Sequence, residues 1–178
     1  MGYSSMMRHN LELKVRYPDL ERAARIVESL GAEYGGTLQQ LDTYFHSREG
    51  RLKLRENAKS EDDAQLIWYE REDDPDICGS TYLLTGVADP TALRESLRRS
   101  VGILTEVRKA RDLYVWENVR IHLDDVEGLG RFIEFEAILD DITGQAGRHK
   151  LQSLCHHLQI EPTSYIGESY ATLVKQKR

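Results

Sequence analysis

The sequence predicts an α+β fold built around an antiparallel sheet or barrel. Roughly eight stretches alternate like strands or are rich in branched and aromatic residues, and three or four stretches have helical periodicity. The strand-like stretches mostly follow one another without the regular helical crossovers that a parallel sheet requires. The 178 residues contain no repeat, low-complexity tract or long linker. We therefore expect one domain over residues 9–178, preceded by an N-terminal extension or cloning remnant at residues 1–8.

The first predicted strand covers residues 10–17, where Leu11, Leu13 and Val15 alternate with polar residues. Gly35-Gly36 predicts a break, and the polar run at residues 57–64 predicts a loop. The remaining strands are expected at 37–47, 51–56, 65–72, 80–87, two or three within 103–126, and 131–139.

Helices are predicted where a capping residue precedes an apolar face. Asp19 can cap a helix that ends at Gly31, and Asp89 can cap one that begins at Pro90. We expect Leu93, Leu97 and Val101 of the second helix to face the core. A third helix follows Thr143 with Leu151, Leu154, Cys155 and Leu158 on its apolar face, and a short fourth covers residues 169–174.

Composition limits the class of partner and the compartment. The formal net charge of −6 argues against non-specific nucleic-acid binding. No apolar run is long enough to span a bilayer, so we expect no membrane partner. Two cysteines are too few for a disulfide framework, which favours the cytosol. The sequence leaves a homodimer open.

Charged side chains recur at alternate positions of several predicted strands, often with one sign per strand. Arg51, Lys53 and Arg55 share a face, as do Glu134 and Glu136. A solvated sheet face would explain any one strand. The whole set equally suits a cationic and an acidic wall around one cavity, because Lys and Arg bind phosphate oxygens and carboxylates bind Mg²⁺ or Mn²⁺. Both interpretations stay open on the pattern alone.

These residues, in this order, resemble the CYTH superfamily, also called triphosphate tunnel enzymes. The family signature Glu-x-Glu-x-Lys corresponds to Asn10-Leu11-Glu12-Leu13-Lys14. The other matching motifs are Leu41-Asp42-Thr43-Tyr44-Phe45, Arg51-Leu52-Lys53-Leu54-Arg55-Glu56, Tyr69-Glu70-Arg71, Val107-Arg108-Lys109-Ala110-Arg111, Val119-Arg120-Ile121-His122-Leu123-Asp124 and Gly128-Leu129-Gly130-Arg131-Phe132-Ile133-Glu134-Phe135-Glu136. The resemblance spans roughly residues 9–175.

The resemblance implies an antiparallel eight-stranded β-barrel, or tunnel, that holds a triphosphate and Mg²⁺ or Mn²⁺. By the same match the phosphate-binding residues would be Lys14, Lys53, Arg55, Arg71, Lys109, Arg111 and Arg120. The metal ligands would be Glu12, Asp124, Glu134 and Glu136, and the residues expected to act in catalysis are Glu12, Lys14 and Arg111. Arg51 is expected to be a solvated charge near a turn.

The motif HLDDVEGLG, followed by a Glu-x-Glu strand, most resembles the branch of class IV adenylyl cyclases, which convert ATP to cyclic AMP and pyrophosphate. Two alternatives remain: a triphosphatase that hydrolyses thiamine triphosphate or inorganic tripolyphosphate, and a non-catalytic module that binds nucleotide or polyphosphate. Asn10 stands where the family usually has its first Glu, which implies a weaker metal site.

Other candidates have simpler explanations. His122 is expected to be a neighbour within the site, and His149, His156 and His157 to be solvated surface rather than a zinc site. Neither Cys78 nor Cys155 has an evident base nearby, so no nucleophile is expected. Packing is the expected role of Trp68, Trp116, Tyr44 and Tyr69, although the two tyrosines could also line the tunnel.

Overall fold

A computed structural model describes residues 7–58, 60–140 and 143–177. The strands are β1 (Arg8–Arg16), β2 (Glu33–Phe45), β3 (Arg51–Asn57), β4 (Ser60–Arg71), β5 (Cys78–Val87), β6 (Ile103–Trp116), β7 (Val119–Val126) and β8 (Gly130–Ile138). The helices are α1 (Leu20–Ser29), α2 (Pro90–Ser100), α3 (Gly144–Leu158) and α4 (Tyr170–Lys177), with a 3₁₀ turn at Pro162–Ser164. The expected extension at 1–8 lies mostly outside the described residues, and β1 begins within it at Arg8.

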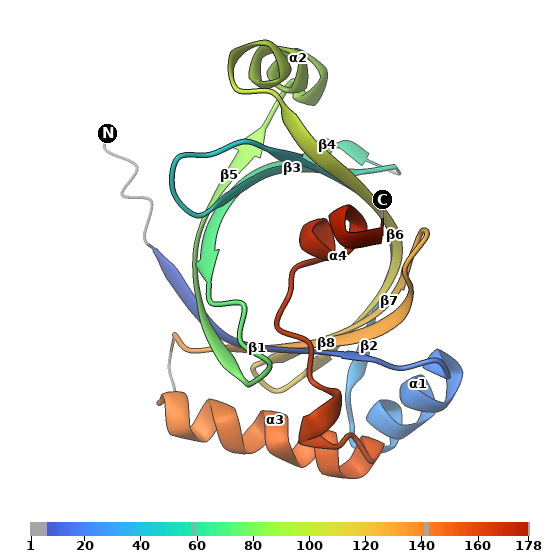
Figure 1. Ribbon diagram of the computed structural model, residues 1–178. Coiled ribbons are helices and arrows are strands. Elements are labelled where there is room, and N and C mark those ends of the chain that lie inside the picture. Colours follow the sequence, from blue (N-terminus) through green and yellow to red (C-terminus); the bar gives the residue numbers. More distant parts are fainter. Residues whose placement is uncertain (1–6, 59, 141–142, 178) are drawn as a thin grey trace.

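The strands form one closed antiparallel barrel in the order β1-β5-β4-β3-β2-β6-β7-β8 (Figure 1). Pairing of β1 with β8 closes it, with Glu12 opposite Glu136 and Lys14 opposite Glu134. The predicted eight-stranded barrel with flanking helices is therefore confirmed. Because side chains alternate along each strand, every strand gives the barrel an inner and an outer face.

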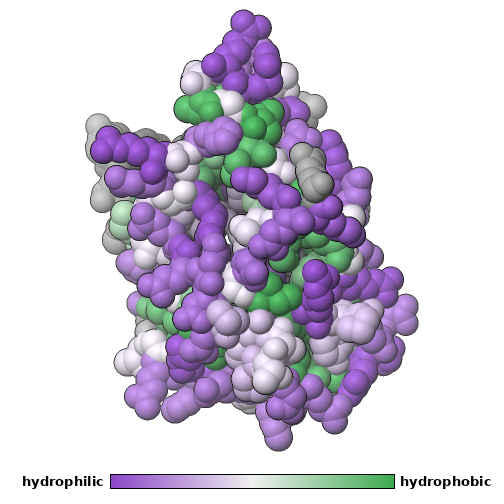
Figure 2. All heavy atoms as spheres, viewed as in Figure 1, coloured by the Kyte–Doolittle hydropathy of each residue, from purple (hydrophilic) through white to green (hydrophobic). Residues whose placement is uncertain are grey.

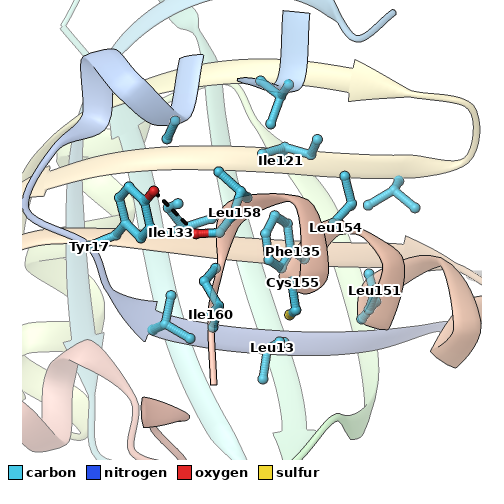
Figure 3. Packing of buried hydrophobic residues seen from close by; sticks show 14 of the residues in the cluster. Leu13, Tyr17, Ile121, Ile133, Phe135, Leu151, Leu154, Cys155, Leu158 and Ile160 are labelled. Atoms are coloured by element: carbon cyan, nitrogen blue, oxygen red, sulfur yellow. Dashed lines mark hydrogen bonds between the residues drawn. The ribbon is translucent and has the colours of Figure 1, made fainter. Parts of the chain in front are cut away.

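The main hydrophobic core lies outside the barrel, between its wall and α1 and α3. Outward-facing Leu13, Ile133 and Phe135 meet Leu154 and Leu158 of α3 there, and all five are almost completely buried (Figure 3). The Tyr17 hydroxyl donates to the Leu158 carbonyl at the edge of this cluster. A smaller cluster that includes Tyr44, Phe132 and Tyr170 packs α4 against the strands, and the rest of the barrel interior is free to carry charge.

Two helices begin at their expected caps, since the side chains of Asp19 and Asp89 accept hydrogen bonds from first-turn amides. The third predicted helix is capped in the same way by Thr143, whose side chain accepts from the Ala146 amide. α2 differs in its packing: none of its residues, all of which the structure describes, is buried. The expectation that Val101 faces the core is wrong, because this residue follows α2 and is 43% exposed. The main contacts of α2 are with β2, β3 and β4.

Two strand boundaries also differ from expectation. Gly35-Gly36 does not break the chain but lies within β2, where the register against β6 shifts between Tyr34 and Gly36. Gly36 has a φ of +112° there, which glycine adopts without a Cβ clash. The polar run at 57–64 is not all loop, since Ser60 pairs with Asn57 and β4 begins there. Backbone pairing to β3 outweighs the weak strand propensity of these residues.

The C-terminal segment lies across one end of the barrel. In Figure 1, α4 appears within the ring of strands, while α1 and α3 lie outside it. Contacts of α4 with β6 place it there. Figure 2 shows that this side of the molecule is mostly hydrophilic, with smaller groups of hydrophobic residues. None of the helices that the structure describes is both long and apolar enough to cross a bilayer.

Candidate active site

The barrel encloses a cavity whose wall is dominated by charge. All seven predicted phosphate-binding residues line it, as do Glu12, Glu134 and Glu136. Ten of the eleven site residues therefore line the cavity. The eleventh, Asp124, shares the inward face of β7 with Arg120 but is fully buried beneath Arg111 and Tyr170, to which it is hydrogen-bonded.

One buried carboxylate, Asp42 of β2, organises half of the cationic wall. Its Oδ2 accepts from Lys53 at 3.1 Å and from Lys109 at 3.1 Å, and its two oxygens accept from Arg55 at 2.7 and 2.8 Å. Burial alone would raise the pKa of Asp42, but Arg55, Lys109 and Lys53 hold it well below its ordinary value. Burial lowers the pKa of Lys109 to about 7, with Asp42 opposing this shift and Arg111 adding to it. Asp42 therefore fixes three cations from two other strands around one point.

Arg111 of β6 is the centre of a second network. It donates from Nε and Nη2 to Asp124 at 2.6 and 2.5 Å, and from Nη2 to Glu134 at 2.6 Å. The hydroxyl of Tyr170 on α4 donates to Asp124 at 2.8 Å. The hydrogen bonds from Arg111 to Asp124 thus fix the guanidinium of Arg111 in the cavity wall.

The acidic wall is formed by β1 and β8. Glu12 and Glu136 lie opposite each other in the ladder, and Lys14 Nζ lies 3.1 Å from Glu134. Burial, then the charge of Glu136, raises the pKa of Glu12 to about 7, against the opposing effect of Arg71. Burial disfavours the charge on Glu134 too, yet Lys14 and Arg111 hold its pKa well below the ordinary value.

Several buried polar groups in or beside the cavity wall have no hydrogen-bond partner among the described residues. They include Nε and Nη2 of Arg71, Oδ1 of Asn10 and Nδ1 of His122. The Arg71 side chain is only 5% exposed, and its closest acidic neighbour, Glu12, is 3.6 Å away. Buried donors are almost always paired in native proteins, so Arg71 calls for a ligand with acceptor oxygens.

His122 lies within the site beside Glu136, with Nδ1 3.7 Å from that carboxylate. Burial, followed by the nearby charge of Arg111, lowers its pKa to about 3, so the imidazole is neutral at physiological pH. Arg120 lies further out, 40% exposed and 3.8 Å from Glu136. Arg51 is only partly solvated, because it pairs with Asp73 and lies over the Tyr69 ring outside the cavity lining.

Of the remaining candidates, two tyrosines belong to the cavity and the others lie elsewhere. Tyr44 and Tyr69 line the cavity. His149, His156 and His157 are exposed on α3, as expected. Cys78 and Cys155 are buried free thiols. Trp68 donates to the Glu49 carbonyl, and Trp116 packs against the outer core.

The sequence did not predict the contribution of the C-terminal segment. Ser169 and Tyr170 line the cavity, and the Glu168 carbonyl accepts from Lys14 Nζ at 3.0 Å. The Tyr170 ring lies 4.3 Å from Lys14 Nζ and 5.4 Å from Lys109 Nζ. An isolated tyrosine at the start of a short helix carries no sequence signal for this role.

The donor set fits a divalent cation in its chemistry. Three carboxylates, Glu12, Glu134 and Glu136, line the cavity, and a hard cation prefers such oxygen ligands. Burial first, and then the like charge of Glu136, raises the pKa of Glu12, and a bound cation would relieve that repulsion. Within the part of the chain that the structure describes, no three acidic, His or Cys side chains already converge as a metal cluster. The fit therefore requires these carboxylates to turn from their present cationic partners.

This chain is similar to several known proteins over most of its length. A protein of Methanocaldococcus jannaschii named "Putative adenylate cyclase MJ0240" is 24% identical over 170 residues, which is 92% of this chain and 97% of that protein. The structure of the PH1012 protein from Pyrococcus horikoshii has a TM-score of 0.83 at 25% identity, covering 92% of this chain and 98% of that one. An X-ray structure of a "putative adenylate cyclase" from Vibrio parahaemolyticus has a TM-score of 0.75 at 20% identity, with 94% and 98% covered.

The family model for the CYTH domain matches residues 8–170. That range includes every strand of the barrel and every residue of the charged wall, from Glu12 on β1 to Glu136 on β8. On this evidence, the chain belongs to the CYTH domain family.

Proposed function

We propose that this protein is a metal-dependent enzyme that acts on a triphosphate, with the chemistry of a class IV adenylyl cyclase. The observation that carries the proposal is the buried guanidinium of Arg71, which faces the cavity with two unpartnered nitrogens. Phosphate oxygens are the acceptors that arginine binds best, through charge-assisted hydrogen bonds.

The charge balance of the cavity supports a polyanionic substrate. Seven cationic side chains line it against three carboxylates, and two further carboxylates, Asp42 and Asp124, lie behind the cations. A surplus of positive charge therefore remains after every internal ion pair is counted. A triphosphate would offset that surplus, and the buried setting would strengthen each contact.

A divalent cation, Mg²⁺ or Mn²⁺, would be held by Glu12, Glu134 and Glu136. When bound, it would neutralise charge on the triphosphate and favour loss of the proton from the attacking hydroxyl. Asp124 contributes indirectly, because its oxygens already accept from Arg111 and Tyr170. Its role in the proposal is to hold Arg111 in place.

In the proposed reaction, the ribose 3′-hydroxyl of ATP attacks the α-phosphorus and pyrophosphate leaves. Lys53, Arg55 and Lys109, fixed around Asp42, would stabilise the charge that develops on the leaving group. Arg71 and Lys14 would hold the triphosphate from the neighbouring walls. This chemistry depends on positioning and charge and needs no covalent enzyme intermediate.

The name of the Methanocaldococcus relative supports the cyclase over other reactions of a triphosphate site, since that protein is matched along nearly its whole length. A direct assay is the test. Purified protein is incubated with ATP, thiamine triphosphate or tripolyphosphate, each with Mg²⁺ or Mn²⁺, and the products are separated. Cyclic AMP with pyrophosphate is the expected result.

Release of orthophosphate without cyclic AMP would indicate a triphosphatase instead of a cyclase. Binding without turnover would indicate a non-catalytic module. Arg71→Gln should abolish most activity. Arg108→Gln is the matched control, because Arg108 lies on the outer face of β6 and is 56% exposed.

A further inference from the structure

Part of the cavity wall carries no charge. Its residues come from three adjacent strands in the barrel order, β1, β5 and β4, although β1 also contributes Glu12 and Lys14 and β4 also contributes Arg71 to the lining. We call the uncharged part the neutral wall, and its cavity-lining members are Asn10, Ser80, Tyr82, Leu84, Ile67 and Gln65. Asn10 pairs with Ser80, and Leu84 pairs with Ile67, so these side chains form one continuous surface.

The middle of the neutral wall is apolar and open. Leu84 is 37% exposed, although Ile67 and Tyr82 beside it are buried. Gln65 lies opposite Gly86, where an added Cβ would meet nothing within 4 Å. An uncovered apolar surface inside an otherwise charged cavity suits an uncharged ring better than a phosphate.

Asn10 adds a hydrogen-bonding requirement to this wall. Its side chain is 97% buried, faces the cavity, and its Oδ1 has no donor among the described residues. A buried acceptor without a donor is costly, so a ligand N–H at this point would be stabilising.

The neutral wall adjoins the phosphate-binding wall. Ser80 pairs with Asn10 on one side and with Arg71 on the other. A ring on the neutral wall would therefore lie close to a phosphate held by the unpartnered nitrogens of Arg71.

We propose that the neutral wall binds the uncharged, amino-bearing base of a nucleoside triphosphate, as in adenine, and that Asn10 Oδ1 accepts a hydrogen bond from its amino group. The inference rests on the proposed binding of a triphosphate in this cavity. It makes Asn10 a specificity-determining residue, in place of the metal-ligand position that the family resemblance implies. Thiamine triphosphate fits less well, because its fixed positive charge would lie near Arg71.

The test compares two nucleotides that differ only in the base with a triphosphate that has no nucleoside. Binding is measured by calorimetric titration in the presence of Mg²⁺. The first ligand is 3′-deoxy-ATP, which lacks the attacking hydroxyl. The second is 3′-deoxy-ITP, which also has a carbonyl in place of the amino group, and the third is tripolyphosphate. The proteins are the parent, Asn10→Ala and Leu84→Ala. Leu83→Ala is the control, because Leu83 is on the outer face of β5.

Asn10→Ala should weaken 3′-deoxy-ATP binding by roughly 5–10-fold, the range for one buried hydrogen bond, and change the other two ligands by less than about twofold. Leu84→Ala should weaken both nucleotides about 3–5-fold and leave tripolyphosphate unchanged, because it removes apolar contact with the ring. Leu83→Ala should change none of the three.

Equal losses for all three ligands in Asn10→Ala would overturn the inference. So would Asn10→Glu lowering the Mg²⁺ needed for tripolyphosphate binding, since that result would make position 10 a metal-ligand position. If the parent binds tripolyphosphate as tightly as 3′-deoxy-ATP, this inference fails while the proposed triphosphate site survives. If the parent binds none of the ligands, the proposed function fails as well.

Discussion

Asp42 and Lys109 form an ion pair inside the barrel, with 3.1 Å between Oδ2 and Nζ and each side chain only 1% exposed. The same carboxylate also binds Lys53 and Arg55. Asp42 and Lys109 are almost completely buried, so the members of this group depend mainly on one another for charge compensation. Asp42 is the only anion among these four side chains, which makes it the residue on which their arrangement depends.

Asp42→Asn should destabilise the protein strongly. Removing one partner from a buried ion pair costs about 3–5 kcal/mol, because the remaining charge is buried without compensation. Urea unfolding measures the loss, and added tripolyphosphate should raise the melting temperature of the variant more than that of the parent. Asp125→Asn is the control, since Asp125 is 54% exposed and pairs with exposed Arg131. Equal losses in the two variants would contradict the role given to Asp42.

Strand alternation was sufficient to predict the inward face of the barrel. A period of two places Lys53 and Arg55 on one side and Leu52 and Leu54 on the other, whatever the tertiary structure. Alternation could not reveal the role of Asp42, although this residue lies in one of the motifs that resemble the family. The partners of Asp42 come from β3 and β6, and Lys109 is 67 residues away in sequence. Only the closed barrel brings them together.

The contribution of α4 to the site could not be predicted from the sequence, for a different reason. Its existence follows from local periodicity, but its position across the barrel end depends on how residues 159–169 return to the sheet. Val15 pairs with Tyr165, and the Ile166 amide donates to the Lys14 carbonyl. These contacts are long-range, so no local pattern predicts that Tyr170 reaches Asp124.

Arg71 offers the cleanest test of phosphate binding. Arg55 and Arg111 compensate buried aspartates, so Arg55→Ala or Arg111→Ala should destabilise the fold as well as weaken binding. Nε and Nη2 of Arg71 make no hydrogen bond among the described residues, and the one ion pair of this side chain there, with Glu12, is long at 3.6 Å. Arg71→Gln should therefore weaken triphosphate binding by about 1.5–3 kcal/mol with little change in melting temperature. Unchanged affinity in calorimetry, with Arg108→Gln as reference, would remove Arg71 from the site.

Glu12 should make the stability of the metal-free protein depend on pH. Its pKa is about 7 in the folded protein, against an ordinary value of 4.5. Between these values the folded state holds a proton that the unfolded chain has lost. The stabilisation from this proton is thus fully present below pH 4.5 and is lost as the pH rises to 7.

Glu12→Gln removes this dependence. The stability of the variant relative to the parent should rise between pH 4.5 and 7, by an amount on the order of 2–3 kcal/mol. Lys109, with a pKa of about 7, acts above this window and is common to both proteins. Unfolding in urea at several pH values measures the difference, with Glu106→Gln as the exposed control. A difference that stays constant with pH would show that Glu12 is not protonated in the folded site.

The absence of a side chain at Gly167 should be required for the C-terminal segment to pack against the barrel. A Cβ at this position would lie 2.7–2.8 Å from backbone atoms of Asp73 and Asp74, too close for either chain to remain in place. Gly167→Ala should push the segment away from the loop before β5. That movement would disturb the next residues, where the Glu168 carbonyl accepts from Lys14 and Tyr170 donates to Asp124.

The expected result for Gly167→Ala is a lower melting temperature together with weaker triphosphate binding, because both contacts of the segment reach the cavity wall. Gly79→Ala is the matched control: a Cβ there meets nothing within 4 Å, and the residue lies in extended backbone of β5. Hydrogen exchange at the amides of residues 166–173 would report the displacement directly. If Gly167→Ala binds triphosphate as the parent does, while exchange at these amides rises, then α4 covers the barrel end without contributing to the site.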